Sequence, residues 1–459
     1  MIVLRPYQQK LIDGGREAYR NGARAVLFNL PTGGGKTVTA STIVHGAAQK
    51  GNVVWWLCHR RELVAQASQT FYNLGIPHGT VQQGTVSNPG ALVQVGSIQT
   101  VARRVNELPE PNLIVFDEAH HIGAASWDDL FHRFPRARIL GLTATPWRLD
   151  GQGLGRWFDD MIVGPTVAEL IEAGALSPYR LFAPSAPDLS SVGITGGDYQ
   201  RGALSKAMDK PQIVGDAIGH YSRLCPGKRA VVFAAGIENS KHIVAQFNAN
   251  GIRAEHVDGS MSAFERDGAV ERFKAGHTLI LSNVDLFGEG FDVPAIEAAI
   301  LLRPTKSLSL YLQQVGRALR PLPGKTEAII LDHAGNSAQP GFGLPDDDRE
   351  WSLEDREKRK KGEKAEVSIR QCDECFFVYK PVPCCPQCGY APPIKAREIE
   401  VVEGSLQEVT RSEPRALFRE QGKAGSLEAL VQLGRERGYK NPEFWARKVW
   451  ASRSARRAA

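Results

Sequence analysis

The stretch Leu30-Pro31-Thr32-Gly33-Gly34-Gly35-Lys36-Thr37 determines how the rest of the chain is interpreted. An apolar run, Ala25-Val26-Leu27-Phe28, precedes it and predicts a buried strand, and residues 38–48 favour a helix. A glycine-rich turn between strand and helix directs backbone N–H groups and a helix N-terminus at one point, which suits a polyphosphate. Lys36 would contact the terminal phosphates and Thr37 a Mg²⁺ ion. The pattern predicts an ATP-binding loop that contains Thr32, Gly33, Gly34, Gly35, Lys36 and Thr37.

The loop departs from the strict pattern, because Leu30 stands where a glycine is usual six positions before Lys36. Three consecutive glycines are also compatible with a flexible turn, so the motifs further along the chain decide. Shortly before the loop lie Arg5 and Gln8. A glutamine amide offers a donor and an acceptor to an adenine edge, and Arg5 can stack on the ring. Both are candidate ATP-binding residues, although a surface turn at Pro6 explains them equally well.

The composition describes a globular protein with an uneven charge distribution. Of the 459 residues, 42% are hydrophobic and 23% charged, and the length suits about three domains. The formal charge is 56 − 50 = +6, and residues 349–459 carry 23 basic and 17 acidic residues, so the whole excess lies there. A basic end favours a nucleic-acid partner, although a solvated tail is equally compatible. Without a signal peptide or an apolar run of ~18 residues, we expect a cytoplasmic protein and no membrane contact.

Two segments suit a phosphodiester backbone. Arg60 and Arg61 follow an apolar run, Val53-Val54-Trp55-Trp56-Leu57, at the point where a helix is expected to begin. A charged helix end that faces water is the alternative. The second segment, residues 95–100, places hydroxyl and amide side chains at the point where a strand is expected to end. The candidate nucleic-acid contacts are therefore Arg60, Arg61, Ser97, Gln99 and Thr100.

A buried strand, Asn112-Leu113-Ile114-Val115-Phe116, delivers Asp117-Glu118-Ala119-His120 at its C-terminal end. Ligands of open α/β sheets bind at that edge. Asp117 can hold Mg²⁺ through water and Glu118 can polarise an attacking water. Two adjacent acids also occur as helix N-caps, but an apolar strand that leads into them after a phosphate loop is more specific.

A second strand, which begins at Arg138, leads to hydroxyl groups at Thr143 and Thr145. These hydroxyls can relay the state of the nucleotide to the rest of the domain. The glycine-rich residues 147–153 that follow are expected to form a mobile loop. The candidate coupling residues are His120, Thr143, Thr145 and Gln313.

With these motifs in place, the chain resembles the superfamily 2 helicases, whose motifs match in order over about residues 4–332. Within the superfamily it is most similar to RadD-like DNA repair proteins, on residues 59–66, on residues 141–150 and on a later cysteine module. Thr143 departs from the serine of many relatives. The resemblance implies two RecA-like domains, hydrolysis of ATP with Mg²⁺, and nucleic acid that lies across both domains.

The second half repeats the alternation of strands and helices. Residues 166–205 are rich in Gly, Pro and Ser and are expected to connect the halves, with a strand at residues 179–182. Strands are expected at residues 229–233, 252–257 and 278–283, and a helix at residues 238–248. By the resemblance, Gly290 and Asp292 approach the nucleotide from this domain. Taken alone, their loop would prove nothing.

Residues 309–320 carry Arg317 and Arg320, which are three positions apart and would project from one face of a helix. Two guanidiniums that face the γ-phosphate across a cleft would stabilise the charge that spreads during phosphoryl transfer. Gly316 would allow close approach to the first domain. A basic helix face in contact with water is the alternative. We treat Lys36, Asp117, Glu118, Arg317 and Arg320 as the candidate catalytic set.

Five of the seven cysteines lie between residues 372 and 388. Two Cys-x-x-Cys pairs predict a tetrahedral structural Zn²⁺ site in a small appendage, with the ligands Cys372, Cys375, Cys385 and Cys388. Cys384 is an alternative to Cys385. The aromatics between the pairs, at residues 376–379, suit base stacking, a protein partner or a small core. The tail from residue 405 onwards is expected to be helical and basic, with a disordered end as the alternative.

The predicted fold class is α/β, with two RecA-like parallel-sheet domains in tandem, a zinc module and a helical tail. The expected domains are residues 1–165, a connector at 166–205, a second domain at 206–340, a charged linker at 341–370, the zinc module at 371–395 and the tail at 396–459. The favoured function is a DNA-dependent ATPase in recombination or repair, with single-strand-binding or recombination proteins as partners. An RNA helicase and a nucleotide-switched scaffold that recruits partners are the alternatives.

Overall fold

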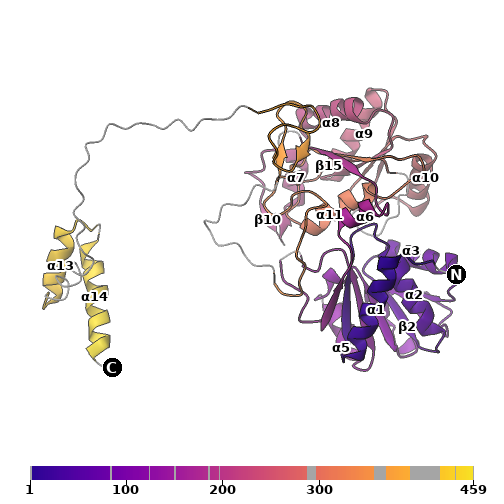
Figure 1. Cartoon of the computed structure of the whole chain (residues 1–459), viewed down its shortest axis with the longest axis horizontal. Coiled ribbons are helices and arrows are strands. Elements are labelled where there is room, and N and C mark those ends of the chain that lie inside the picture. The colour runs from indigo at the N-terminus through magenta and orange to yellow at the C-terminus, as the bar shows by residue number, and fades with distance from the viewer. Residues whose placement is uncertain are drawn as a thin grey trace. The chain divides into compact units, whose positions relative to one another are not determined.

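The computed structural model describes residues 3–82, 85–123, 125–148, 151–183, 187–195, 197–286, 296–355, 369–392, 424–439 and 441–457. The chain forms two compact units, residues 1–393 and 394–459, and each is described on its own. In Figure 1 the first unit runs from indigo through magenta to orange, and the described helices of the second are yellow. None of the helices within these ranges is long and apolar enough to cross a membrane.

The first domain is an eight-stranded sheet in the order β4-β3-β5-β2-β6-β7-β1-β8. Its neighbouring strands are parallel except for β3 and β4. Its elements are α1 (Pro6–Arg20), β1 (Ala25–Asn29), α2 (Lys36–Ala48), β2 (Val54–Cys58), α3 (Arg61–Asn73), β3 (Gly79–Gln82), β4 (Thr85–Ser87), β5 (Val93–Ser97), α4 (Ile98–Arg103), η1 (Val105–Glu107), β6 (Leu113–Asp117), η2 (Ala119–His121), α5 (Ala125–Arg133), β7 (Arg138–Thr143) and β8 (Asp160–Val163).

The central strands of this sheet are buried along their whole length because helices cover both faces. In β1, Val26 and Phe28 join the core under α1, α2 and α3, whereas Ala25 and Leu27 join the core under α4 and α5. The apolar runs of the sequence therefore mark fully buried strands, as expected. The motif residues follow these strands at one edge of the sheet.

The second domain is a six-stranded, all-parallel sheet in the order β13-β14-β12-β15-β16-β9. The expected strand at β9 is confirmed, and it pairs with β16 although it lies within the expected connector. The elements are α6 (Val167–Glu172), β9 (Tyr179–Phe182), β10 (Ile194–Thr195), β11 (Asp198–Tyr199), α7 (Arg201–Met208), α8 (Pro211–Leu224), β12 (Ala230–Ala234), α9 (Ile237–Ala249), β13 (Ala254–Val257), α10 (Ala263–Lys274), β14 (Ile280–Asn283), β15 (Ala298–Leu302), α11 (Leu308–Ala318) and β16 (Ala328–Asp332).

The cysteine module, with its short strands β17 (Arg370–Gln371) and β18 (Val378–Tyr379), packs directly on β9. Phe377 forms an antiparallel bridge with Phe182, and their ring centroids are 5.5 Å apart. The backbone N–H of Ala183 donates to the carbonyl of Phe376 at 3.0 Å. Val378 is buried in the core of the second domain. The expectation of a separate appendage is therefore wrong, and base stacking is not the use that the structure makes of Phe377.

The segment after the second domain returns to the first. Trp351 packs against Trp147 with ring centroids 4.9 Å apart, and the N–H of Gly155 donates to the carbonyl of Leu353 at 2.8 Å. The loop at residues 147–153, which was expected to be mobile, thus contacts this segment through Trp147. Part of the expected charged linker, residues 356–368, and the start of the expected tail, residues 405–423, lie outside the described residues.

The second unit contains α13 (Leu427–Glu436) and α14 (Pro442–Arg457), which pack against each other. Gly434 lies so close to α14 that an added Cβ would be 2.9 Å from Pro442 Cβ. The expected helical character of the tail is confirmed for these residues.

Candidate active site

The phosphate loop lies between β1 and α2, and its glycines are required by its backbone. Gly33 and Gly35 have φ angles of 86° and 88°, a left-handed conformation that only glycine adopts readily. A Cβ on Gly35 would be 2.5 Å from Gln8 Nε2. The hydroxyl of Tyr7 donates to the carbonyl of Gly34 at 2.8 Å and holds the loop against α1. Lys36 is then the first residue of α2.

The acidic pair lies at the C-terminal end of β6, as the sequence predicted. Burial, reinforced by the neighbouring Glu118 and opposed by Lys36, raises the pKa of Asp117 to about 7. Lys36 Nζ lies 4.0 Å from Glu118 Oε1. Glu118 has a φ of 52°, a conformation that non-glycine residues seldom adopt outside constrained sites. Two carboxylates and one ammonium therefore face the position where a Mg²⁺-bound triphosphate would lie.

The expected relay is partly assembled. His120 Nδ1 lies 3.5 Å from Glu118 Oε2 and 3.2 Å from Thr143 Oγ1. The Thr143 hydroxyl in turn donates to the carbonyl of Thr145 at 2.7 Å. A continuous polar path thus leads from the acidic pair into the loop after β7. Gln313 is buried on α11, and its role in coupling stays a prediction.

The arginine pair, Arg317 and Arg320, lines the same cleft as Lys36 and Glu118, and this cleft has a volume of about 560 Å³. That size suits a nucleotide. A Cβ on Gly316 would be 2.6 Å from Thr32 Cβ, so the expected close approach of the domains is confirmed. The pair does not share one helix face, because α11 ends at Ala318 and Arg320 lies beyond it. Arg320 precedes a proline, and this position disfavours helical backbone.

Arg5, Gln8 and Thr37 also line this cleft. Gln8 Oε1 accepts from the N–H of Arg5 at 2.9 Å, and Gln8 Nε2 is 3.5 Å from the carbonyl of Gly35. The amide therefore bridges α1 and the phosphate loop while its side chain borders the cleft. Gly290 and Asp292 lie outside the described residues.

A second groove, of about 520 Å³, takes residues from both domains. Three arginines converge on Asp285, which lies two residues after β14. Arg60 of the first domain donates to its carbonyl at 2.7 Å, Arg201 Nη2 lies 3.3 Å from its carboxylate, and Arg303 pairs with the same carboxylate. With Asp198 as a second acid, the groove keeps a cationic excess. We call it the basic groove.

The other candidate nucleic-acid residues lie elsewhere. Ser97 is the N-cap of α4, and its hydroxyl accepts from the N–H of Thr100 at 3.3 Å. Arg61 and Gln99 are exposed. Sequence reasoning missed Arg201 and Arg303 as groove residues, because they belong to no short motif and meet only in the folded chain.

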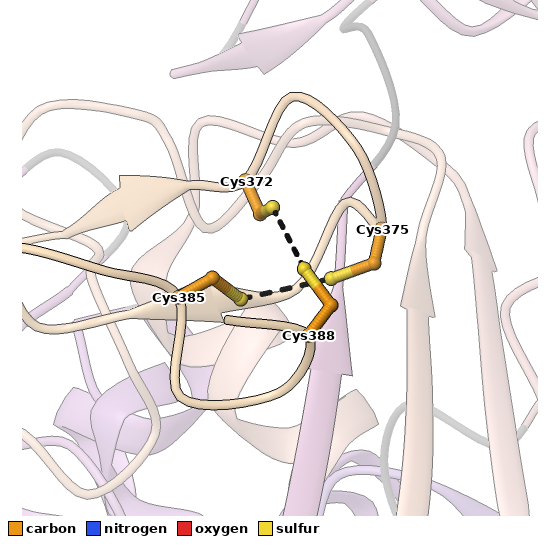
Figure 2. Close-up of side chains that lie close together, drawn as sticks. All are labelled: Cys372, Cys375, Cys385 and Cys388. Carbon is orange, nitrogen blue, oxygen red and sulfur yellow. Dashed lines mark hydrogen bonds between the residues drawn. The ribbon is translucent and has the colours of Figure 1, made fainter. Parts of the chain in front are cut away.

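The four predicted cysteines come together, two from each loop of the module (Figure 2). Their sulfur atoms all lie within 4.8 Å of one another, and Sγ–Sγ distances are 3.6 Å for Cys372 and Cys388 and 3.7 Å for Cys375 and Cys385. A tetrahedron of thiolates with Zn–S bonds of ~2.3 Å has edges of about 3.8 Å. The donor set therefore fits zinc, and Cys384 is exposed and outside the cluster.

Two RecA-like domains with a phosphate loop and acidic pair on one, and an arginine pair on the other, define the class of two-domain helicase-type ATPases. Two family models match the chain. One, for the res subunit of type III restriction enzymes, covers residues 1–148, and the other, for the helicase conserved C-terminal domain, covers residues 209–321.

Individual proteins agree with the family models. A 51.5 kDa protein of Lactococcus phage (isolate 7-9) is 34% identical over 93% of this chain and 94% of its own length. IRC3 of Saccharomyces cerevisiae, named as an ATP-dependent helicase, is 32% identical over 73% of this chain, and the chain spans about half of its length (52%).

Two solved structures share the fold. An HsdR-subunit fragment of a type I restriction enzyme from Vibrio vulnificus YJ016 has a TM-score of 0.59 and 24% identity, over 74% of this chain and 66% of the fragment. The restriction-modification enzyme LlaBIII bound to DNA has a TM-score of 0.54 and 20% identity, over 72% of this chain and 27% of that protein. The chain belongs to the superfamily 2 helicases, and it is an ATP-hydrolysing enzyme of that family.

Proposed function

We propose that the chain is a DNA-dependent ATPase that translocates on, unwinds or remodels DNA in recombination or repair. The observation that carries the proposal is the basic groove, which takes Arg60 from the first domain and Arg303 from the second. A phosphodiester strand in this groove would contact both domains at once. Domain closure on ATP and release after hydrolysis would then move the strand.

In this proposal the residues of the nucleotide cleft divide the work. Lys36 and the loop N–H groups bind the phosphates, and Thr37 and Asp117 are the residues that would hold Mg²⁺, which would supply positive charge against the developing phosphate charge. Glu118 lies beside Lys36 and orients the attacking water as its base. The arginine pair stabilises the γ-phosphoryl group from the other domain, so hydrolysis requires the two domains to meet.

Two neighbouring elements connect the cleft to the groove. α11 lines the groove near Ser307 and Ser309 and carries Arg317 at the nucleotide cleft. His120, which contacts Glu118, also borders the groove. A strand bound in the groove is therefore one or two side chains from the groups that hydrolyse ATP. This arrangement supports stimulation of hydrolysis by nucleic acid.

In this proposal the nucleic acid is DNA, as in LlaBIII, which shares this fold and was solved with DNA bound. The zinc module and the tail would add contacts to DNA or to single-strand-binding or recombination proteins. Similarity to RadD-like repair proteins in particular stays a prediction.

The test is ATP hydrolysis without nucleic acid, then with single-stranded, duplex and forked DNA, and with RNA. We expect DNA to stimulate hydrolysis, and Arg201→Ala should raise the DNA concentration needed for half-maximal stimulation, because its side chain is exposed in the groove. Lys241→Ala, an exposed lysine on α9 outside the groove, is the control. Stimulation by RNA alone would instead identify an RNA remodeller, and no stimulation by either would reject the proposal.

A further inference from the structure

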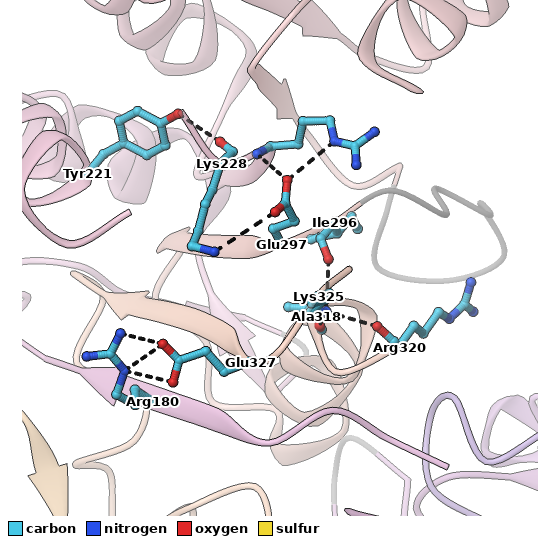
Figure 3. A network of polar contacts seen from close by, with 10 residues as sticks. Arg180, Tyr221, Lys228, Ile296, Glu297, Ala318, Arg320, Lys325 and Glu327 are labelled. Carbon is cyan, nitrogen blue, oxygen red and sulfur yellow. Dashed lines mark hydrogen bonds and ion pairs between the residues drawn. The ribbon is translucent and has the colours of Figure 1, made fainter. Parts of the chain in front are cut away.

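The arginine pair is held in place by an unusual contact at the end of its helix. The ammonium group of Lys325 donates to three backbone carbonyls, those of Ile296 at 3.0 Å, Arg320 at 2.9 Å and Ala318. Figure 3 shows Lys325 at the Arg320 carbonyl, while the Arg320 side chain extends to the opposite side. All three protons of the ammonium group are thus used by main-chain oxygens.

Few other groups are available to these carbonyls, although the Arg320 carbonyl also accepts from the hydroxyl of Ser177 at 3.4 Å. The last carbonyls of a helix have no intrahelical donor, and the C-terminal end of a helix favours a cation. Ala318 is the last residue of α11, and Arg320 lies two residues further along the chain. The connector adds a second contact, because the N–H of Ser177 donates to the carbonyl of Leu319 at 2.7 Å. The backbone on both sides of the arginine pair is therefore fixed from outside the helix.

The third carbonyl lies just before a strand of the second domain. Ile296 is buried and is two residues before β15. One side chain therefore joins the end of the arginine helix to the start of β15. Burial lowers the pKa of Lys325 to about 8, with Glu297 opposing and Lys228 reinforcing this effect, which agrees with an ammonium group solvated by carbonyls instead of water.

We propose that Lys325 is a positioning residue for ATP hydrolysis. It holds Arg317 and Arg320 where their guanidinium groups can face the γ-phosphate. The proposal rests on the role given above to the arginine pair. Without the ammonium group the end of α11 loses three hydrogen bonds, and a displacement of about 1 Å in a catalytic group can cost 10²-fold in rate. Phosphate-loop contacts are on the other domain, so ATP binding is unaffected.

The test uses the full chain and the substitution Lys325→Met, which keeps the aliphatic stem. We expect kcat to fall about 10-fold to 100-fold, while KM for ATP changes less than about threefold. The matched control is Lys228→Met, a lysine of the same network whose ammonium group lies 4.0 Å from Glu297 and contacts no part of α11 that the structure describes. Thermal melting of each variant checks that it is folded.

A double-mutant cycle separates positioning from general stability. In a background that carries both Arg317→Ala and Arg320→Ala, Lys325→Met should lower kcat less than about twofold further, because both groups that it positions are absent. Equal losses in both backgrounds, or no loss in the single variant, would overturn the role of Lys325 and leave the role of the arginine pair intact. If Arg320→Ala itself left kcat unchanged, the assigned role of the arginine would fail as well. Should Lys325→Met not fold, the same cycle with Lys325→Arg, which keeps the charge but not the tetrahedral donors, decides.

Discussion

The two RecA-like domains meet at one cleft but are assembled differently. The first draws its strands and its catalytic groups from one continuous stretch, residues 25–163, and these groups lie at the C-terminal end of a strand or in the turn after it. The second takes its edge strand β9 from the connector, its cover over β9 from the cysteine module and one support of the backbone beside its arginine pair from Ser177. We infer that the first half-site is preformed by local turns, whereas the second depends on distant contacts.

The largest effects should come from the first domain. Lys36→Ala removes the ammonium group that neutralises the terminal phosphates, and turnover should be undetectable. Glu118→Gln keeps the shape but removes the base, so hydrolysis should fall by about 10³-fold or more while ATP still binds. A coupled-enzyme ATPase assay and fluorescent-nucleotide titration measure the two quantities. Full hydrolysis by Glu118→Gln would show that the base is another residue.

The second domain should contribute to rate more than to binding. Arg317→Ala is expected to cost ~10³-fold in kcat, the scale typical of arginine fingers, with ATP affinity within a fewfold of wild type. The same two assays apply. If neither kcat nor ATP affinity changed, the second domain would not be the half of the site that activates hydrolysis.

The difference between the domains also explains what the sequence could predict. Asp117 and Glu118 were placed correctly because a buried strand fixes where its next residues lie. The pair Cys372 and Cys375, with its partner pair, was recognisable because the ligand spacing is local. Arg201 and Arg303 were not identified, because their contacts with Asp285 arise only when the chain is folded.

Two errors have the same physical origin. The arginine pair was expected on one helix face, but a proline directly after Arg320 ends the helix early. The cysteine module was expected to be separate, yet Phe377 and Val378 are needed to cover β9. Periodicity and spacing describe an element by itself, whereas both outcomes depend on what lies next to it.

Removal of the metal site should affect the two domains unequally. Cys372→Ser combined with Cys375→Ser should abolish zinc binding, measured as metal per chain, because two of four thiolates are lost. Since the module packs on β9, the second domain should melt at a lower temperature, and hydrogen exchange in β9 and β16 should accelerate while β1 and β6 are unchanged. Cys384→Ser, whose thiol lies outside the cluster, should keep zinc and stability. Metal loss without faster exchange in β9 would show that the module is a true appendage.

The smallest effect should come from the ion pair that joins the domains outside the cleft, Glu62 on α3 and Arg266 on α10, whose charged atoms are 3.6 Å apart. Glu62 is 30% exposed and Arg266 14% exposed, so water screens the pair and its net contribution should be at most about 1 kcal/mol. Glu62→Gln should therefore change KM for ATP less than about fivefold. The change should shrink as salt is raised from 50 to 500 mM, because added ions screen the attraction between exposed charges. The double variant with Arg266→Gln provides the coupling energy. A coupling energy well above about 1 kcal/mol would mean that domain closure depends on this surface contact. The arginine pair would then be positioned by docking of the second domain on the first more than by contacts within the second domain.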